Sequence, residues 1–266
     1  MVTIIILLII IGLAVGIISG FFGIGGGVIS IPFFVIVFNH FNLFQNGTSI
    51  HYAQGTTLAM MIFTSLASIL KHKQSGIILW DVLKKMLFYV AIGVIIGGIC
   101  STTFPSKIIE IVFSIYLVIM GGYTLLNVFK EKEQKTLHAN KSIWATIGTI
   151  VGFKSGLLGI GGGTVIIPIL LAMRYPVKKV AGTSAVITFT VSCVGTLIYF
   201  VSGGMHEGWY HSYSLGYIYF PALVVVTPFS FCAAKLGVKW NKNCSPKLLK
   251  ILFAAVLIAL GINMFR

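Results

Sequence analysis

Charged residues are scarce in this 266-residue chain: they make up 9% of it, and only five are Asp or Glu. Soluble domains are roughly one quarter charged. Because 57% of the residues are hydrophobic, the chain could not cover a globular surface with polar groups. The composition therefore excludes a soluble globular protein, a disordered chain and a small disulfide scaffold, and it indicates an integral membrane protein that crosses the bilayer several times.

The chain also lacks the motifs of catalysis and metal binding. Its four cysteines form no CxxC pair, and no G-x-S-x-G, HExxH or paired buried carboxylates occur. The GIGGG motif lacks the G-K-[ST] of a phosphate-binding loop. We therefore expect no catalytic residue, no metal and no cofactor. The net charge of +14 is expected to record membrane orientation rather than a nucleic-acid partner.

Apolar runs fill most of the chain. About 20 apolar residues are needed for a helix to cross the hydrocarbon core. Six runs fit this length: 52–70, 86–104, 107–129, 181–201, 214–236 and 248–265. Two further stretches, 2–38 and 143–173, are interrupted by GIGGG. Since each helical Gly costs about 1 kcal/mol relative to Ala, we expect the chain to break at these glycines.

The positive charges predict the topology. Sixteen of the 19 Lys and Arg residues lie in or beside four connections: 71–85, 130–141, 174–179 and 235–250. Positive residues collect in cytoplasmic loops, so we assign these four connections to the cytoplasm. The stretches 2–38 and 143–173 then each begin and end on one side, as hairpins do. Each half is one hairpin plus three spans, which places both termini outside.

A sequence repeat agrees with this topology. GIISGFFGIGGG at 16–27 recurs as GFKSGLLGIGGG at 152–163. Pro32 and Pro168 follow at the same offset, and further along AQGTT at 53–57 resembles VAGTS at 180–184. We therefore predict an all-α integral membrane protein with an inverted-topology repeat, in which each half is a glycine-tipped helical hairpin plus three transmembrane helices. Its parts are a first repeat, a cytoplasmic linker and a second repeat, over residues 1–129, 130–142 and 143–266.

The glycine tips have two interpretations. Glycine lets helices pack closely, which is a structural role. Alternatively, the helices that follow the glycines begin with unpaired amides and partial positive charge, and broken helices near the membrane midplane bind anions in transporters. We favour packing combined with substrate binding. The backbone candidates are Gly25, Gly26, Gly27, Gly161, Gly162 and Gly163.

The doubled G-x-x-S-G-x-x-G-I-G-G-G-x-x-x-x-P motif resembles the TauE/SafE family, the sulfite-exporter-like permeases. The resemblance covers both halves of the chain. It implies a membrane permease or exporter of small sulfur-containing anions such as sulfite, sulfonates or thiosulfate.

Lys154 is a single cation within an apolar run, where the first repeat has Ile18. A buried Lys is costly unless it faces a cavity or a partner. It is about 20 Å of helix from the linker, so we favour an anion contact over snorkelling. Further candidates are hydroxyls and an amide near the repeated glycines, although each hydroxyl could equally bond its own helix. They are Ser19, Ser155, Thr56, Thr57, Thr183, Ser184 and Gln54.

Proton coupling through a buried side chain is not expected. All acidic residues and all six His residues map to loops or segment ends, and His51 is expected at an interface rather than in a proton relay. The expected partners are a small anion and the lipid bilayer of the cell membrane, with a homodimer left open. The alternatives are an integral membrane enzyme or assembly factor that uses Lys154, a permease for another small solute, and a cation or metal permease.

Overall fold

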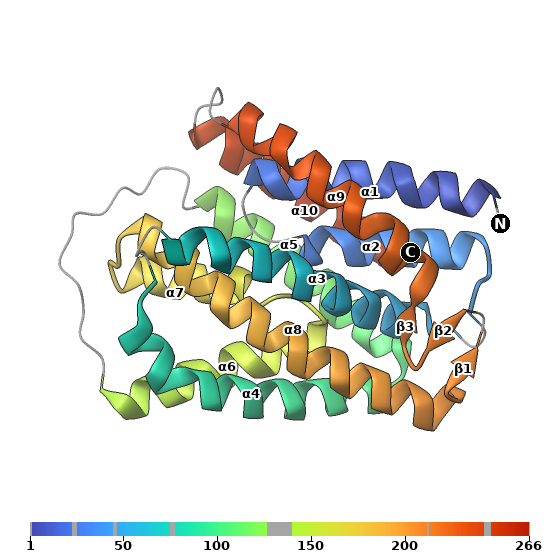
Figure 1. Ribbon diagram of the computed structural model, residues 1–266, viewed down its shortest axis with the longest axis horizontal. Helices are drawn as coiled ribbons and strands as arrows, with labels where there is room; N and C mark the ends of the chain where they lie inside the picture. Colours follow the sequence, from blue (N-terminus) through green and yellow to red (C-terminus); the bar gives the residue numbers. More distant parts are fainter. Residues whose placement is uncertain are drawn as a thin grey trace.

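The computed structural model describes residues 2–22, 26–44, 47–74, 78–126, 140–211, 213–241 and 246–265. These residues form a bundle of ten α-helices, drawn in Figure 1. The helices are α1 (Val2–Phe22), α2 (Gly27–His40), α3 (Ser49–Gln74), α4 (Trp80–Thr103), α5 (Ser106–Leu126), α6 (Lys141–Leu158), α7 (Gly163–Ala172), α8 (Val177–Glu207), α9 (Phe220–Asn241) and α10 (Pro246–Met264).

Four helical segments are long and apolar enough to cross a membrane: Ser49–Leu70, Trp80–Thr103, Ser106–Leu126 and Lys179–Glu207. Shorter apolar helices accompany them, α2 and α7 among them. Large apolar side chains such as Phe88 and Leu126 lie exposed on the outside of the bundle, as expected of side chains that face lipid. The prediction of a helical, multi-pass membrane protein is therefore confirmed.

One predicted span is wrong at its beginning. Residues 214–219 are not helical: β1 (Tyr210–His211), β2 (Ser214–Leu215) and β3 (Ile218–Tyr219) form a small antiparallel sheet, and α9 starts only at Phe220. Gly216 has a φ of 55°, which turns the chain between β2 and β3. The next amide, that of Tyr217, donates to the carbonyl of Tyr199 in α8 at 3.2 Å, so the sheet is fixed to the bundle.

The chain breaks at both glycine motifs, as predicted. Helix α1 ends at Phe22 and α2 begins at Gly27, while α6 ends at Leu158 and α7 begins at Gly163. In Figure 1, α1 runs inward from the right-hand end of the bundle and α2 returns to it. Helices α6 and α7 do the same from the left-hand end. The described segments thus form two hairpins that enter the bundle from opposite ends.

Glycines allow the hairpins to pack tightly on other helices. Gly16 of α1 lies against the backbone of Ser230 in α9, and Gly152 of α6 lies against the backbone of Val90 in α4. A Cβ at either glycine would collide with the facing carbonyl oxygen, so only glycine permits these helix pairs to approach. These two glycines, at the start of the repeated motif, therefore serve helix packing.

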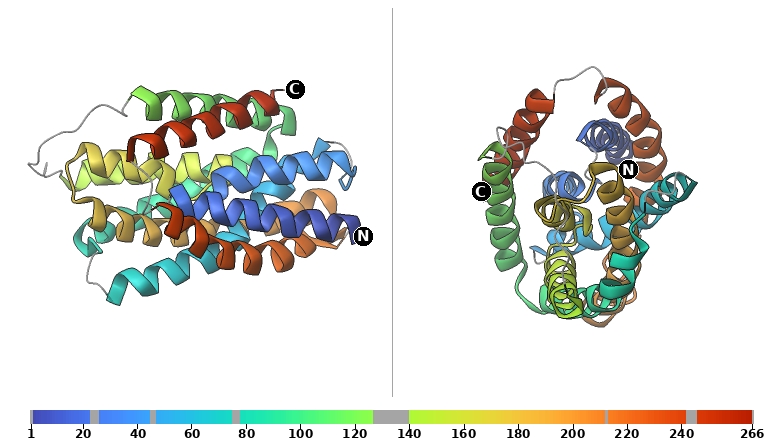
Figure 2. Two further views of the ribbon diagram at one scale, coloured as in Figure 1. Left: turned by 90° about the horizontal axis from the view of Figure 1, so that it is seen from above. Right: turned by 90° about the vertical axis from the view of Figure 1, so that its left-hand side faces the viewer.

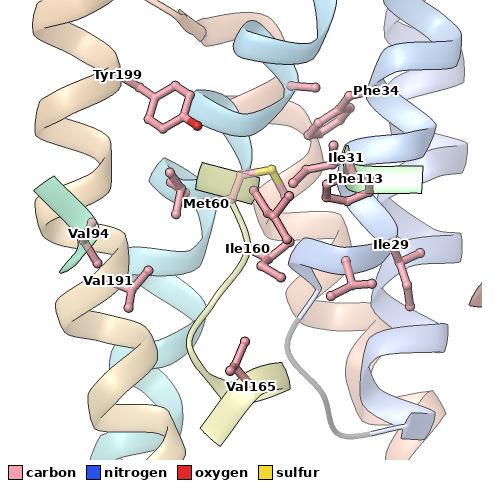
Figure 3. Packing of buried hydrophobic residues seen from close by; sticks show 14 of the residues in the cluster. Ile29, Ile31, Phe34, Met60, Val94, Phe113, Ile160, Val165, Val191 and Tyr199 are labelled. Carbon is pink, nitrogen blue, oxygen red and sulfur yellow. The ribbon is translucent and has the colours of Figure 1, made fainter. Parts of the chain in front are cut away.

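Helices from the first half of the chain pack on helices from the second half. Helix α3 packs on α8, and α5 packs on α10 along one side of the bundle, as Figure 2 shows. Buried apolar residues from both hairpins belong to a single core cluster. Figure 3 shows part of it, with Ile160 from the link between α6 and α7 and with Ile29 and Ile31 from α2.

The positive charges are distributed unevenly along the bundle. The end of α3 and the starts of α4, α6 and α8 gather at the left-hand end in Figure 1, whereas α1 begins at the right. Lys73, Lys84, Lys141 and Lys179 belong to those left-hand helix ends. This distribution is the one that the positive-inside argument requires. The orientation in the bilayer, with both termini outside, stays a prediction.

Candidate functional site

The second helix break is closed by a glycine in the left-handed conformation. Gly159 caps the C-terminus of α6 with φ 66° and ψ 19°, and its amide donates to the carbonyl of Ser155, in the usual geometry of a glycine helix end. The amide of Ile160 also donates to that carbonyl, at 3.2 Å. A Cβ at Gly159 would lie 2.5 Å from the side chain of Gln54, so the turn packs directly on α3.

Side chains from α3 and α8 satisfy the carbonyls that α6 leaves unpaired at its end. The Gln54 amide nitrogen donates to the Leu157 carbonyl at 3.2 Å. The Tyr199 hydroxyl lies 3.0 Å from both the Gly156 carbonyl and the Gln54 amide oxygen. A broken helix inside a membrane needs such partners because water is absent there. Gln54, predicted as a substrate ligand, is thus already engaged with the helix break.

The start of α7 carries the amides that the sequence predicted for anion binding. One of them is occupied: the Gly163 amide donates to the Thr188 hydroxyl at 3.1 Å. The Thr164 hydroxyl donates to the Gly161 carbonyl at 3.2 Å. Within the described part of the chain, the amides of Gly161, Gly162 and Thr164 donate to no backbone carbonyl outside the helices and to no side chain, unlike that of Gly163. These three donors lie at the positive end of the α7 dipole.

The tips of the two hairpins lie next to each other. A Cβ at Gly27 would be 3.4 Å from the amide nitrogen of Gly161 and 2.7 Å from the sulfur of Met61. The methyl end of Met61 also packs against Gly161, so this α3 side chain contacts both tips. Gly26 caps α2, and its carbonyl accepts the Ser30 amide at 2.8 Å. Gly25 and the Ser19 side chain lie outside the described residues.

Lys154 is half-buried and faces an aromatic ring. Its ammonium nitrogen lies 5.4 Å from the centroid of the Tyr116 ring, within the range of a cation–π interaction. The Tyr116 hydroxyl in turn donates to the Thr164 hydroxyl at 3.4 Å. Tyr116 of α5 therefore links the cation on α6 to the first turn of α7, through its ring on one side and its hydroxyl on the other.

The predicted hydroxyls divide into two groups. Thr56 and Thr183 hold loops: the Thr56 hydroxyl accepts the Tyr219 amide at 2.9 Å, and the Thr183 hydroxyl accepts the Leu79 amide at 2.9 Å. Ser184 bonds the carbonyl of Ala181 within its own helix at 2.9 Å. In contrast, the buried hydroxyls of Thr57 and Ser155 have no hydrogen-bond partner among the described residues.

Thr57 and Ser155 are well placed for a ligand. Thr57 lies on α3 between Gln54 and Met61, and spacings of three and four residues put all three on one helix face. That face contacts both hairpin tips. Ser155 lies one turn before Gly159 on α6. A buried hydroxyl without a partner is costly, so both groups are available for a bound water or solute.

Three residues near the tips were missed by the sequence analysis: Tyr116, Met61 and Thr188. Tyr116 stands in a continuous apolar helix, where an aromatic residue is usually a core residue. Met61 and Thr188 each follow Thr57 and Ser184 by four residues. Extending the comparison of the repeats by one helical turn would therefore have found this pair.

His51 lies at the start of α3, the segment end at which it was expected, but its side chain is buried, with 3% of its surface exposed. Its ring lies 5.3 Å from that of Tyr217, because the small sheet folds over this end of α3. Its Nδ1 atom has no hydrogen-bond partner in the part of the chain that the structure describes.

Comparison with known proteins gives a consistent result. The family model described as "Sulfite exporter TauE/SafE" matches residues 8–264. A probable membrane transporter protein of Methanocaldococcus jannaschii is 33% identical, over 97% of this chain and 94% of its own length. One of Haemophilus influenzae is 31% identical, over 100% and 99%. The probable membrane transporter protein YunE of Bacillus subtilis is 27% identical, over 96% and 95%. All three are described as transporters, not enzymes.

Proposed function

The chain belongs to the sulfite exporter TauE/SafE family of membrane transporters, and we propose that it carries a small sulfur-containing anion, such as sulfite, a sulfonate or thiosulfate. The anion is bound where the two hairpin tips meet. The observation that carries this proposal is the group of donors at the start of α7, the amides of Gly161, Gly162 and Thr164, to which Tyr116 links the cation of Lys154.

The electrostatics of this site favour an anion over a cation. Helix N-termini carry partial positive charge, and Lys154 adds a full one. The described chain has no cluster of three or more His, Cys, Asp or Glu residues that could hold a metal ion. A divalent cation would therefore meet amides and an ammonium rather than carboxylates, which disfavours the cation-permease alternative.

Donor hydrogen bonds would supply selectivity. An oxyanion of sulfur has several acceptor oxygens, which match the amides of α7 and the hydroxyls of Thr57 and Ser155. Charge-assisted bonds of this kind are about twice as strong as neutral ones. Met61, which contacts both tips, fills the space that the anion would enter, so binding requires this flexible side chain to move aside.

We also propose that the two halves form an inverted repeat. Corresponding helices exchange partners: α1 packs on α9, and α4 packs on α6. Corresponding threonines do the same. Thr56 holds the amide of Tyr219 just before α9, and Thr183 holds that of Leu79 just before α4. Pairwise exchange of this kind is what a two-fold axis in the membrane plane produces, and such an axis brings the two tips together.

Counterflow in proteoliposomes tests the proposal directly. Vesicles loaded with unlabelled anion are diluted into a trace of radiolabelled sulfite, thiosulfate or an alkyl sulfonate, and label accumulates only if one carrier site exchanges the two pools. We expect counterflow with at least one of these anions and none with radiolabelled choline, a cation control. Counterflow of choline but of no anion would refute the proposed site chemistry.

A further inference from the structure

The buried His51 stands apart from the anion site and calls for a role of its own. An imidazole nitrogen buried without a partner costs free energy, and ionisable groups inside membrane segments are usually functional. His51 lies one helical turn before Gln54 on α3, so the two side chains share one face of the helix. His51 therefore neighbours a residue that holds the second helix break.

Gln54 extends this connection to the end of α6. Its amide nitrogen donates to the Leu157 carbonyl at 3.2 Å, and its amide oxygen accepts the Ser101 hydroxyl at 3.2 Å. The carbonyl end of a helix carries partial negative charge and favours a cation. The break thus has two unlike ends. The end of α6, on the His51 side, favours positive charge, and the start of α7 favours negative charge.

We propose that His51 is a proton-binding site that couples the movement of a proton to that of the anion, in the same direction. The inference rests on the proposed transport function. A proton from water bonds to the free Nδ1 lone pair, and the resulting imidazolium is stabilised through Gln54 by the carbonyl end of α6. An anion at the start of α7 stabilises it further. The two ions therefore bind cooperatively at one break and leave together.

The groups around His51 are consistent with this role. Burial, aided by the nearby Glu207 carboxylate, raises the pKa of Tyr217 to about 12, so this phenol stays neutral near pH 7. Tyr52 adjoins His51 on α3 and also packs on Tyr217, with ring centroids 5.2 Å apart. His206 and Glu207 end α8 beside this cluster. Glu207 contributes a carboxylate at this end of α8, whereas a charged His206 opposes an imidazolium at His51.

The experiment compares exchange with gradient-driven uptake in the same vesicles. Counterflow of radiolabelled sulfite, thiosulfate or an alkyl sulfonate at equal pH needs no net proton movement. Accumulation from an acidic bath into an alkaline lumen needs coupling. We expect the wild type to do both. His51→Gln should retain counterflow and lose the pH-gradient-driven accumulation. The matched control, His40→Gln, changes an exposed His at the end of α2 and should retain both.

Each other result has a definite meaning. Accumulation retained by His51→Gln, or a wild type that ignores the pH gradient, overturns the coupling role. Loss of counterflow in His51→Gln also overturns it, because His51 would then serve binding or folding. A wild type without counterflow for any probe refutes the proposed function itself, and the coupling role with it. That failure is distinguishable because it occurs before any gradient is applied.

Discussion

Replacing Lys154 with Met is the most direct test of the anion site. The substitution removes the charge and keeps an unbranched apolar stem of similar length. In the structure the ammonium lies 5.4 Å from the Tyr116 ring centroid and has no carboxylate partner within the described residues. A half-buried cation of this kind does little for stability, so we expect Lys154→Met to fold normally, with an unchanged or slightly higher melting temperature.

Anion affinity should respond strongly. A hydrogen bond to a charged group contributes about 1.5–3 kcal/mol, which corresponds to about 10- to 150-fold in Kd. Lys154→Arg can preserve the stacking on Tyr116, since a guanidinium also binds aromatic faces. It replaces a compact point charge with a planar fork, however, and we expect it to be poorly tolerated. If Lys154→Arg keeps the contact with the Tyr116 ring but binds the anion poorly, anion binding requires the compact point charge of lysine.

Calorimetry or ligand-induced thermal shift on the purified variants measures the effect. Lys141→Met is the matched control, because it makes the same change at an exposed position in the first turn of the same helix and should leave affinity unchanged. Wild-type affinity in Lys154→Met would refute the reasoning. Lys154 would then be a structural lysine that rests on Tyr116, and the site would consist of amides and hydroxyls alone.

Three further predictions concern topology, the tips and helix packing. A cysteine at Asn140, in a background without the native cysteines, should resist labelling by an impermeant reagent outside intact cells; efficient labelling would refute the inverted topology. Gly26→Val and Gly162→Val should abolish transport in protein that still inserts. A Cβ at Gly162 would also lie 2.6 Å from the Ile187 side chain. The double variant Gly162→Ala/Ile187→Ala is therefore tested as well, because it adds the Cβ and removes the colliding atom. Normal transport in both valine variants and in the double variant would mean that the tips only pack. Gly152→Leu should lower the melting temperature, since overpacking costs about 1–3 kcal/mol. The control Gly122→Leu should not lower it, because there is open space beside Gly122. Equal melting temperatures for the two variants would contradict the close α4–α6 contact.

The sequence was sufficient for the helix breaks because their cause is local. A run of glycines is unfavourable in any helix, whatever surrounds it. Both described hairpins accordingly begin their second helix at the last glycine, Gly27 and Gly163. The small sheet was not predicted, because its strands are two residues long. Strands this short show no alternating pattern, and β2 and β3 lie within the apolar run 214–236.

The environment of single polar residues depends on contacts that are distant in sequence. The burial of His51 was not predicted, because it involves contacts such as that with Tyr217, 166 positions later in the chain. Gln54 was expected to face a ligand, but its partners are Leu157 and Tyr199 in the other half. The spacing of residues within α3 carries no information on these contacts. The repeat would have indicated them only if matching segments of the two halves had been predicted to pack against each other.

Residues that match between the two repeats serve packing, whereas residues that differ between them lie near the helix breaks. The matched residues Gly16 and Gly152 meet facing backbones, and Thr56 and Thr183 hold the starts of helices. Duplication preserved them because both halves need the same packing. The unmatched pairs lie near the helix breaks: Ile18 against Lys154, Met61 against Thr188, and Gln54 against Ala181. A symmetric frame needs no such differences for stability, whereas an asymmetric anion requires an asymmetric set of donors. The cation, the occupied amide of Gly163 and the Gln54 bond to the Leu157 carbonyl all belong to the second break, and there we place the specificity of transport.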